Sequence, residues 1–182
     1  MSEYFRLIID DDNELELINQ DHANELFDLI EDNREYLKEW LPWLDNNRYL
    51  QNTIDYIKIS QLQHERNETV QFVLLHKGEI VGTIGFHRID WMNRSTSIGY
   101  WIAKRHQGSG LVTKSCSSVL DFSFGTMGLH RIEIRCATEN LKSQAIPKRL
   151  GFKEEGLIRQ AEWLYDHYVD HIVYGMLESE WI

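Results

Sequence analysis

The stretch of sequence that decides the fold is residues 98–112, which read IGYWIAKRHQGSGLV. Its first five residues are mostly β-branched or aromatic, a composition that favours a β-strand. From position 112 onward, apolar side chains recur at helical spacing, at positions 112, 116, 119 and 120. The sequence therefore predicts a strand that turns through Gly108 and Gly110 into a helix.

A turn of this kind is a potential binding site for phosphate. The first backbone N–H groups of a helix have no partner within the helix, and the helix dipole favours negative charge there. Gly108 and Gly110 can adopt positive φ and let a pyrophosphate approach the main chain closely. Neither G-x-x-x-x-G-K-[ST] nor G-x-G-x-x-G is present. The alternative interpretation is an ordinary strand-to-helix turn.

Composition indicates a globular protein. The chain has 182 residues, of which 42% are hydrophobic and 12% aromatic, and we expect a single domain spanning 1–182. No apolar run approaches membrane-spanning length, and residues 1–4 lack the basic start of a signal peptide. We therefore expect a cytoplasmic protein without a membrane partner. Cys116 and Cys136 are expected to be free, buried thiols without a context that would activate them.

The charge is distributed unevenly along the chain. Residues 1–91 carry 8 Lys+Arg and 19 Asp+Glu (net −11), and residues 92–182 carry 11 and 10 (net +1), which together give −10. This balance argues against nucleic acid as a direct partner. An anionic cofactor on the second half and a cationic substrate on the first half would suit it, as would a general requirement for solubility.

The remaining elements predict a mixed α/β (α+β) fold. Its central sheet should be mostly antiparallel and flanked by about four helices. Besides the elements above, strands are expected at 5–9, 15–18, 70–76, 80–91, 130–137, 152–160 and 168–177, and helices at 22–33, 53–67 and 140–150. Asp21 is the expected cap of the first helix, and Lys77 and Gly78 should turn a hairpin. The tryptophans of Trp40-Leu41-Pro42-Trp43 belong either to the core or to the wall of a substrate pocket.

Two motifs in this order resemble those of the GNAT acetyltransferases. Arg105, Gly108 and Gly110 match R-x-x-G-x-G, the acetyl-CoA-binding signature of that superfamily. A second match to N-x-x-S…G-F follows, with Asn140, Ser143 and the pair at 151–152. Residues 40–43, 157–164 and 168–174 resemble the RimJ/RimL branch, which acetylates the N-terminal α-amine of ribosomal proteins, and the ribosomal-protein-serine enzymes look most similar.

The resemblance implies a GNAT fold, acetyl-CoA as cosubstrate and a ribosomal-protein N-terminus as acceptor. It also implies a set of site residues. The expected cofactor-binding residues are Trp101, Ile102, Ala103, Arg105, His106, Gln107, Gly108, Ser109, Gly110, Leu111, Asn140 and Ser143, and the expected substrate-binding residues are Trp40, Trp43 and Tyr100. Lys114 and Arg149 are further candidates for contacting phosphate. Each of these cations could equally be a solvated surface charge.

The expected catalytic residues are Glu162 and Ser143. An α-amino group has a pKa of about 7.7–8.0, so a nearby base speeds its attack on a thioester. The resemblance implies Glu162 for this role, acting through water, with Glu133 as the alternative. It implies that the Ser143 hydroxyl hydrogen-bonds the leaving sulfur, although Ser143 could also be a helix N-cap. Pro147 departs from the family pattern and could distort the helix at Ser143.

Several alternatives remain open at this stage. The acceptor could be a small amine such as a polyamine, amino sugar or amino acid, or the chain could be a CoA-binding regulatory module without turnover. A homodimer is expected by analogy with the family. No metal is expected, since the ligand-type residues within 166–171 have no accompanying cluster. Direct transfer in a ternary complex is preferred because no activated cysteine is evident.

Overall fold

The computed structural model describes residues 5–182, so the N-terminal residues 1–4 considered above lie outside it. The strands are β1 (Arg6–Asp10), β2 (Asn13–Leu17), β3 (Gln71–His76), β4 (Glu79–Phe86), β5 (Ser95–Ile102), β6 (Arg131–Ala137), β7 (Lys153–Leu164) and β8 (His167–Leu177). The α-helices are α1 (Ala23–Asp32), α2 (Arg34–Lys38), α3 (Leu50–Glu65), α4 (Leu111–Asp121) and α5 (Leu141–Arg149).

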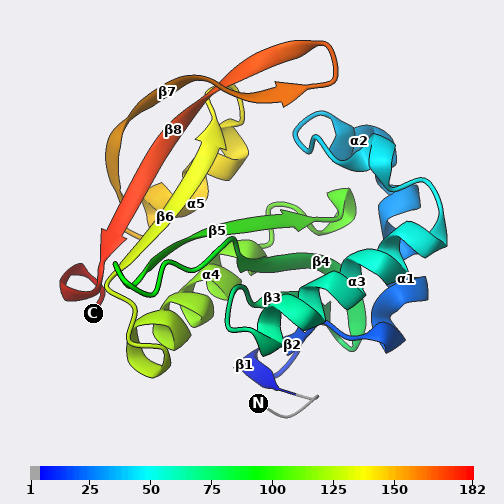
Figure 1. Ribbon diagram of the computed structural model, residues 1–182, viewed down its shortest axis with the longest axis horizontal. Helices are drawn as coiled ribbons and strands as arrows, with labels where there is room; N and C mark the ends of the chain where they lie inside the picture. Colours follow the sequence, from blue (N-terminus) through cyan, green and yellow to red (C-terminus); the bar gives the residue numbers. More distant parts are fainter. Residues whose placement is uncertain (1–4) are drawn as a thin grey trace.

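The eight strands form one sheet in the order β1-β2-β3-β4-β5-β6-β8-β7 (Figure 1). Every neighbouring pair is antiparallel except β5 and β6, which confirms the expected mixed, mostly antiparallel sheet. The β3–β4 hairpin turns at Lys77 and Gly78, whose φ angles of 53° and 82° are typical of a two-residue hairpin turn.

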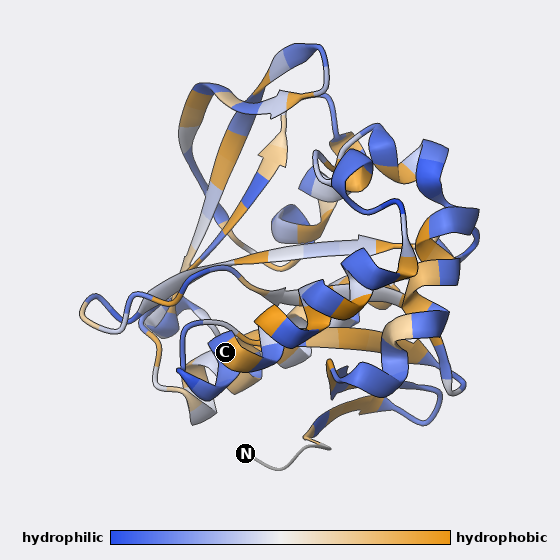
Figure 2. Ribbon diagram, turned by 45° about the vertical axis from the view of Figure 1, so that its right-hand side comes forward, coloured by the Kyte–Doolittle hydropathy of each residue, from blue (hydrophilic) through white to orange (hydrophobic). Residues whose placement is uncertain are grey.

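Helices cover both faces of this sheet. On one face, Cys116, Val119 and Leu120 of α4 pack into a cluster that also holds Ile134 of β6 and Ile146 of α5. On the other face, α1 and α3 pack onto β3 and β4 in a second cluster. In Figure 2 the helices carry hydrophobic residues alternating with hydrophilic ones, as expected for amphipathic helices on a sheet.

The central feature of the sheet is the divergence of β5 from β6. Their parallel ladder consists of Ser95↔Arg131, Thr96↔Ile132 and Ser97↔Glu133. β5 nevertheless continues to Ile102 on its β4 side, and β6 continues to Ala137 on its β8 side. The two strands therefore separate after Ser97 and leave an opening between the halves of the sheet.

Some boundaries differ from the sequence-based expectation. Asp21 does not cap α1; the Asn19 side chain instead accepts a hydrogen bond from the Asp21 N–H in a short 3-10 turn before the helix. β4 ends at Phe86 rather than at the expected residue 91, and in the turn that follows Asp90 accepts a hydrogen bond from the Asn93 N–H. β7 extends to Leu164, and α2 was not anticipated. Within residues 5–182, no helix is long and apolar enough to cross a membrane.

Candidate active site

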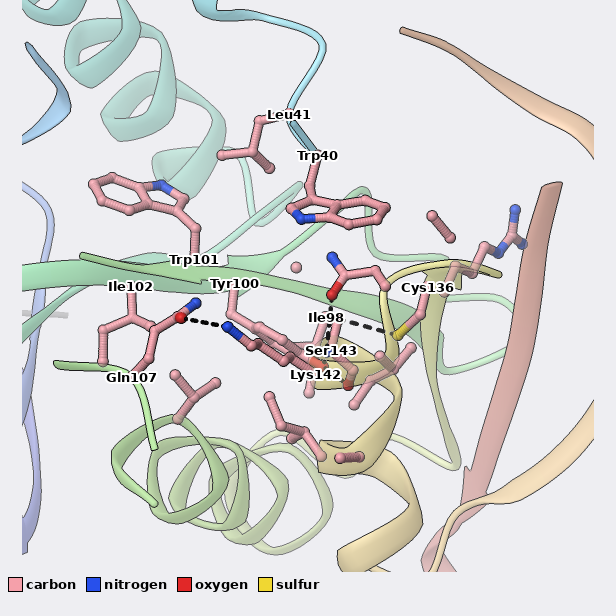
Figure 3. A pocket seen from close by; sticks show the side chains of 18 of the residues that line it. Trp40, Leu41, Ile98, Tyr100, Trp101, Ile102, Gln107, Cys136, Lys142 and Ser143 are labelled. Carbon is pink, nitrogen blue, oxygen red and sulfur yellow. Dashed lines mark hydrogen bonds between the residues drawn. The ribbon is translucent and has the colours of Figure 1, made fainter. Parts of the chain in front are cut away.

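A cleft of about 1050 Å³ occupies the opening between β5 and β6. Because side chains alternate along β5, the cleft reaches both faces of the sheet. In Figure 3, Trp101 points to one face of β5, toward Trp40 and Leu41, whereas Tyr100 and Ile102 point to the opposite face, where α4 and α5 lie. Two ligands entering from opposite faces would therefore meet beside β5.

The glycine turn lies on the α4 side of the cleft. Gly108 and Gly110 have φ angles of 75° and 78°, which confirms the expected positive φ. Gly110 immediately precedes α4, whose start has no side-chain cap. A Cβ at either glycine would meet no protein atom within 4 Å, so the space in front of the turn is open. The uncapped N–H groups at the start of α4 are therefore available to an anion.

Of the three cations expected to contact phosphate, Arg149 lines the cleft, whereas Arg105 and Lys114 do not. Lys142 and Arg149 line it, and Lys142 Nζ lies 3.0 Å from Gln107 Oε1. Arg105 is directed away, with a guanidinium nitrogen 3.5 Å from Glu79, and Lys114 pairs with Asp10. Ala103 is also absent from the lining, since it is fully buried. The other expected cofactor-binding residues line the cleft.

Ser143 is held in a hydrogen-bond network rather than acting as a helix cap. The N-cap of α5 is Asn140, whose Oδ1 accepts from the Ser143 N–H at 3.0 Å. Ser143 Oγ lies 3.2 Å from Cys136 Sγ and 3.3 Å from the Tyr100 hydroxyl. Ser143 thus keeps its hydroxyl in the cleft. Asn140, expected to bind the cofactor, lines the cleft and also caps α5.

Pro147 is accommodated within α5 by a contact from β5. A proline has no N–H, so it leaves the carbonyl four residues earlier, that of Ser143, without its helical donor. The Tyr100 hydroxyl donates to this carbonyl at 3.1 Å. Burial raises the pKa of Tyr100 well above its usual value, which keeps the phenol protonated as a donor. Tyr100, expected to bind the acceptor, therefore lies on the α5 side and positions Ser143.

A β-bulge in β7 places Glu162 in the cleft. The β7–β8 register shifts between Ile158 and Glu162. Within the bulge, Gln160 has a φ of 51°, and its N–H donates to Asp170 at 2.7 Å. Glu162 lines the cleft with an Oε2 that is 3.5 Å from His171 Nε2. A bulge commonly re-aims a side chain in this way.

Glu133, the alternative base, is placed differently. It lies outside the cleft lining and forms ion pairs with Arg131 and Arg135, at 2.8 and 2.9 Å. Burial favours a higher pKa for Glu133, but the hydrogen bonds from the two arginines outweigh it and hold the pKa below its usual value. A carboxylate stabilised in this way is a weak proton acceptor.

The tryptophan segment closes the other face of the cleft. Trp40 and Trp43 both line it, as expected for a substrate pocket. The turn of the β7–β8 hairpin lies against this segment, where the Tyr165 hydroxyl donates to the Leu41 carbonyl. Lys38 Nζ lies 4.3 Å from the centre of the Tyr165 ring. The hairpin and the α2 loop thus form one continuous wall.

Several polar side chains in the lining were not singled out as site residues from the sequence, among them His87, Ser97, Lys142 and His171. The pairing of β4 with β5 would have placed His87 opposite Ser97, because antiparallel neighbours follow from the register. His171 could be placed beside Glu162 in the cleft only once the β7 bulge was known, and no local sequence pattern indicated that bulge. Within the described part of the chain, no group of three His, Cys, Asp or Glu side chains is arranged to hold a metal ion.

Comparisons with known proteins agree with this architecture. The acetyltransferase (GNAT) domain family matches residues 14–153. The putative ribosomal N-acetyltransferase YdaF of Bacillus subtilis is 33% identical over 172 residues, 92% of each chain. The ribosomal-protein-serine acetyltransferase of Escherichia coli is 29% identical over 164 residues, covering 90% of this chain and 92% of its own.

Among solved structures, RimL, a ribosomal L7/L12 α-N-protein acetyltransferase in complex with coenzyme A, superposes with a TM-score of 0.92. It is 25% identical, and the match covers 95% of this chain and 98% of RimL. The fold and the two-sided cleft define an enzyme that transfers an acyl group from CoA. The chain belongs to the GNAT acetyltransferase family and is an acetyl-CoA-dependent N-acetyltransferase of the RimL/RimJ type.

Proposed function

We propose that this enzyme acetylates the N-terminal α-amine of a ribosomal protein by direct transfer in a ternary complex. The observation that carries the proposal is the cleft itself, which joins an anion-binding turn on one face of the sheet to Glu162 and two tryptophans on the other. The similarity to YdaF and to the serine acetyltransferase, over nine-tenths of each chain, supports a ribosomal-protein acceptor.

The residues on the α4 side fit acetyl-CoA. The N–H groups at the glycine turn and the start of α4 would hold the pyrophosphate, and Lys142 and Arg149 add positive charge beside it. The gap between β5 and β6 leaves one edge of residues 98–102 unpaired, and a backbone N–H of residues 100–102 would stabilise the developing oxyanion. Acetyl-CoA supplies the acetyl thioester.

Glu162 and Ser143 would act on opposite sides of β5. Glu162 would accept a proton from the acceptor ammonium through one water, and Ser143 would donate a hydrogen bond to the leaving sulfur. Burial raises the pKa of Cys136, only partly opposed by hydrogen bonds from Ser143 and Tyr100. Cys136 is therefore a neutral thiol at physiological pH, which supports direct transfer over an acetyl-cysteine route.

Mass spectrometry of a ribosomal-protein mixture incubated with the enzyme and acetyl-CoA tests the acceptor. We expect a mass increase of one acetyl group on the N-terminal peptide of at least one protein, and a slower increase with Glu162→Gln at neutral pH. Acetylation of spermidine, an amino sugar or a free amino acid, with unmodified ribosomal N-termini, would replace this proposal with a small-amine acceptor.

Two further properties follow from the proposed acceptor and the family. We expect the enzyme to be cytoplasmic, since ribosomal proteins are made there, and to be a homodimer. Fractionation of cells and light scattering of the purified protein test these expectations.

A further inference from the structure

His87 lies in the cleft on the acceptor side, immediately after the end of β4. Its backbone N–H donates to the Ser97 carbonyl, which extends the β4–β5 pairing by one residue. Its ring lies against Gly99 of β5: a Cβ built at Gly99 would be 2.9 Å from His87 Cε1 and 3.2 Å from Nε2. The missing side chain at Gly99 therefore creates the space that the imidazole occupies, one residue before the segment 100–102.

Ser97 fixes which nitrogen of the ring faces the cleft. His87 Nδ1 lies 2.9 Å from Ser97 Oγ. Either atom of this contact can be the donor, so its geometry admits a neutral ring with the proton on Nδ1 and a lone pair on Nε2, and this is the tautomer that the proposal below requires. Within residues 5–182, Nε2 has no hydrogen-bond partner.

The electrostatic surroundings keep this ring neutral. The charged and titratable groups that face it are Arg135 on β6, Glu162 on β7 and His171 on β8. Partial desolvation in the cleft is the largest effect and lowers the pKa of His87. Arg135 lowers the pKa further, whereas the Ser97 backbone and Glu162 raise it. The net result is a pKa below the usual value. Since an ordinary histidine has a pKa of about 6.5, His87 is predominantly unprotonated at pH 7 and can accept a proton.

The transfer reaction requires two proton acceptors. An acceptor bound as R–NH₃⁺ loses one proton before its lone pair can attack, and the nitrogen loses a second proton once the N–C bond has formed. The electron pair on the carbonyl oxygen then reforms the C=O bond as the C–S bond breaks. One proton ends on the CoA sulfur and the other in solvent, giving R–NH–COCH₃, CoA–SH and H⁺.

We propose that His87 is a second catalytic residue of this enzyme and that its Nε2 accepts the proton that the acceptor nitrogen loses after it has bonded to the acetyl carbon. The first proton goes to Glu162, as proposed above, so this inference rests on the proposed function of Glu162. The juxtaposition that carries it is an imidazole held by Ser97 over Gly99, with an Nε2 that has no hydrogen-bond partner within residues 5–182, beside the strand at which the two ligands would meet.

The kinetic test compares the parent with His87→Asn, which can still hydrogen-bond Ser97 but does not titrate. The probe is a Ser-initiated, lysine-rich peptide, with kcat measured from pH 5 to 9.5 at saturating acetyl-CoA. We expect the kcat of His87→Asn to fall about 10²-fold at pH 7.5, the lower range for general acid–base catalysis. In the pH profile of His87→Asn, the acid-side decline of kcat that results from protonation of His87 should be absent. High pH should not restore the rate of this variant.

Two comparisons separate this role from a structural one. Gly99→Ala, whose methyl group would displace the ring, should lower kcat similarly, and His87→Asn should add little in that background. His130→Asn, an exposed histidine outside the cleft, should retain the parent profile. Unchanged KM for acetyl-CoA and an unchanged Tm would show that neither cleft variant acts through folding or cofactor binding.

The ring tautomer provides a readout that needs no acceptor. ¹⁵N chemical shifts of His87 in the parent should show a protonated Nδ1 and an unprotonated Nε2 above its titration, with and without CoA. A protonated Nε2, or a His87→Asn variant that keeps the parent's kcat profile, would overturn the assignment. If the parent does not acetylate the peptide, the proposed acceptor is wrong. The kinetic test then uses an amine that the parent does acetylate, such as spermidine. The tautomer of His87 still decides the role of Nε2 in that case.

Discussion

Replacing Tyr100 with phenylalanine tests how the enzyme tolerates a proline one turn after Ser143, the residue proposed to donate a hydrogen bond to the leaving sulfur. The substitution removes the hydroxyl that donates to the Ser143 carbonyl at 3.1 Å, and Pro147 cannot supply an N–H in its place. A partly buried acceptor left unsatisfied costs about 1–3 kcal/mol. For a chain of about this length, each kcal/mol lowers Tm by roughly 2–4 °C. We therefore expect Tyr100→Phe to lower Tm by several degrees.

The matched control restores the helical donor. In Pro147→Ala, the new N–H at position 147 can bond the Ser143 carbonyl, so the Tyr100 hydroxyl is no longer its only donor. Tyr100→Phe should then cost less than in the parent, with a coupling energy of about 1 kcal/mol between the two positions. The bond from Ser143 Oγ to the Tyr100 hydroxyl is lost in both backgrounds, so its contribution cancels.

Urea unfolding of the four proteins of this cycle, followed by tryptophan fluorescence, gives the coupling energy. Thiol release on the same samples should show that Tyr100→Phe also reduces kcat, because Ser143 loses its fixed orientation. An equal loss of stability in the parent and in the Pro147→Ala background would refute the reasoning, since Tyr100 would then not be replacing the missing helical donor.

Three more outcomes are expected. CoA should raise Tm, and Gly110→Val should remain folded but abolish that shift. A β-branched residue is strained at a φ of 78°, and its side chain would occupy the open anion site. CoA binding by Gly110→Val equal to that of the parent would contradict the phosphate assignment. Glu162→Gln should reduce the rate most at low pH and be partly rescued at high pH, where the amine is already neutral. Ser143→Ala should lower the rate about tenfold. Identical pH profiles for the parent and Glu162→Gln would remove Glu162 from the role of base. Added salt should lower kcat/KM for a Lys/Arg-rich, Ser-initiated peptide but not for a neutral one. The double variant Asp32→Lys/Glu35→Lys, on the exposed acidic side of α1 and α2, should erase this difference. Equal salt responses of the two peptides in the parent would leave the acidic half of the chain with a role in solubility alone.

The sequence determined by itself the features that depend on local backbone chemistry. Glycine is needed where φ is positive and open space must remain, so Gly108 and Gly110 marked the turn before α4. Period-two and period-3.6 patterns marked most strands and helices, and their order indicated a mostly antiparallel sheet. Two motifs at the right separation then indicated the family.

Only the tertiary structure decided how side chains from distant strands meet. β5 separates from β6 after three paired positions, β5 continuing beside β4 and β6 beside β8, and this separation between distant segments has no local sequence signal. The bulge that brings Glu162 beside His171, and the contact by which Tyr100 satisfies the carbonyl released by Pro147, both join residues far apart in the chain. Arg105 shows the reverse case: it completes the motif in the sequence, yet it does not line the cleft. Its exposed guanidinium lies 3.5 Å from Glu79. A motif specifies the position of the backbone, whereas the direction of a long side chain depends on its tertiary surroundings.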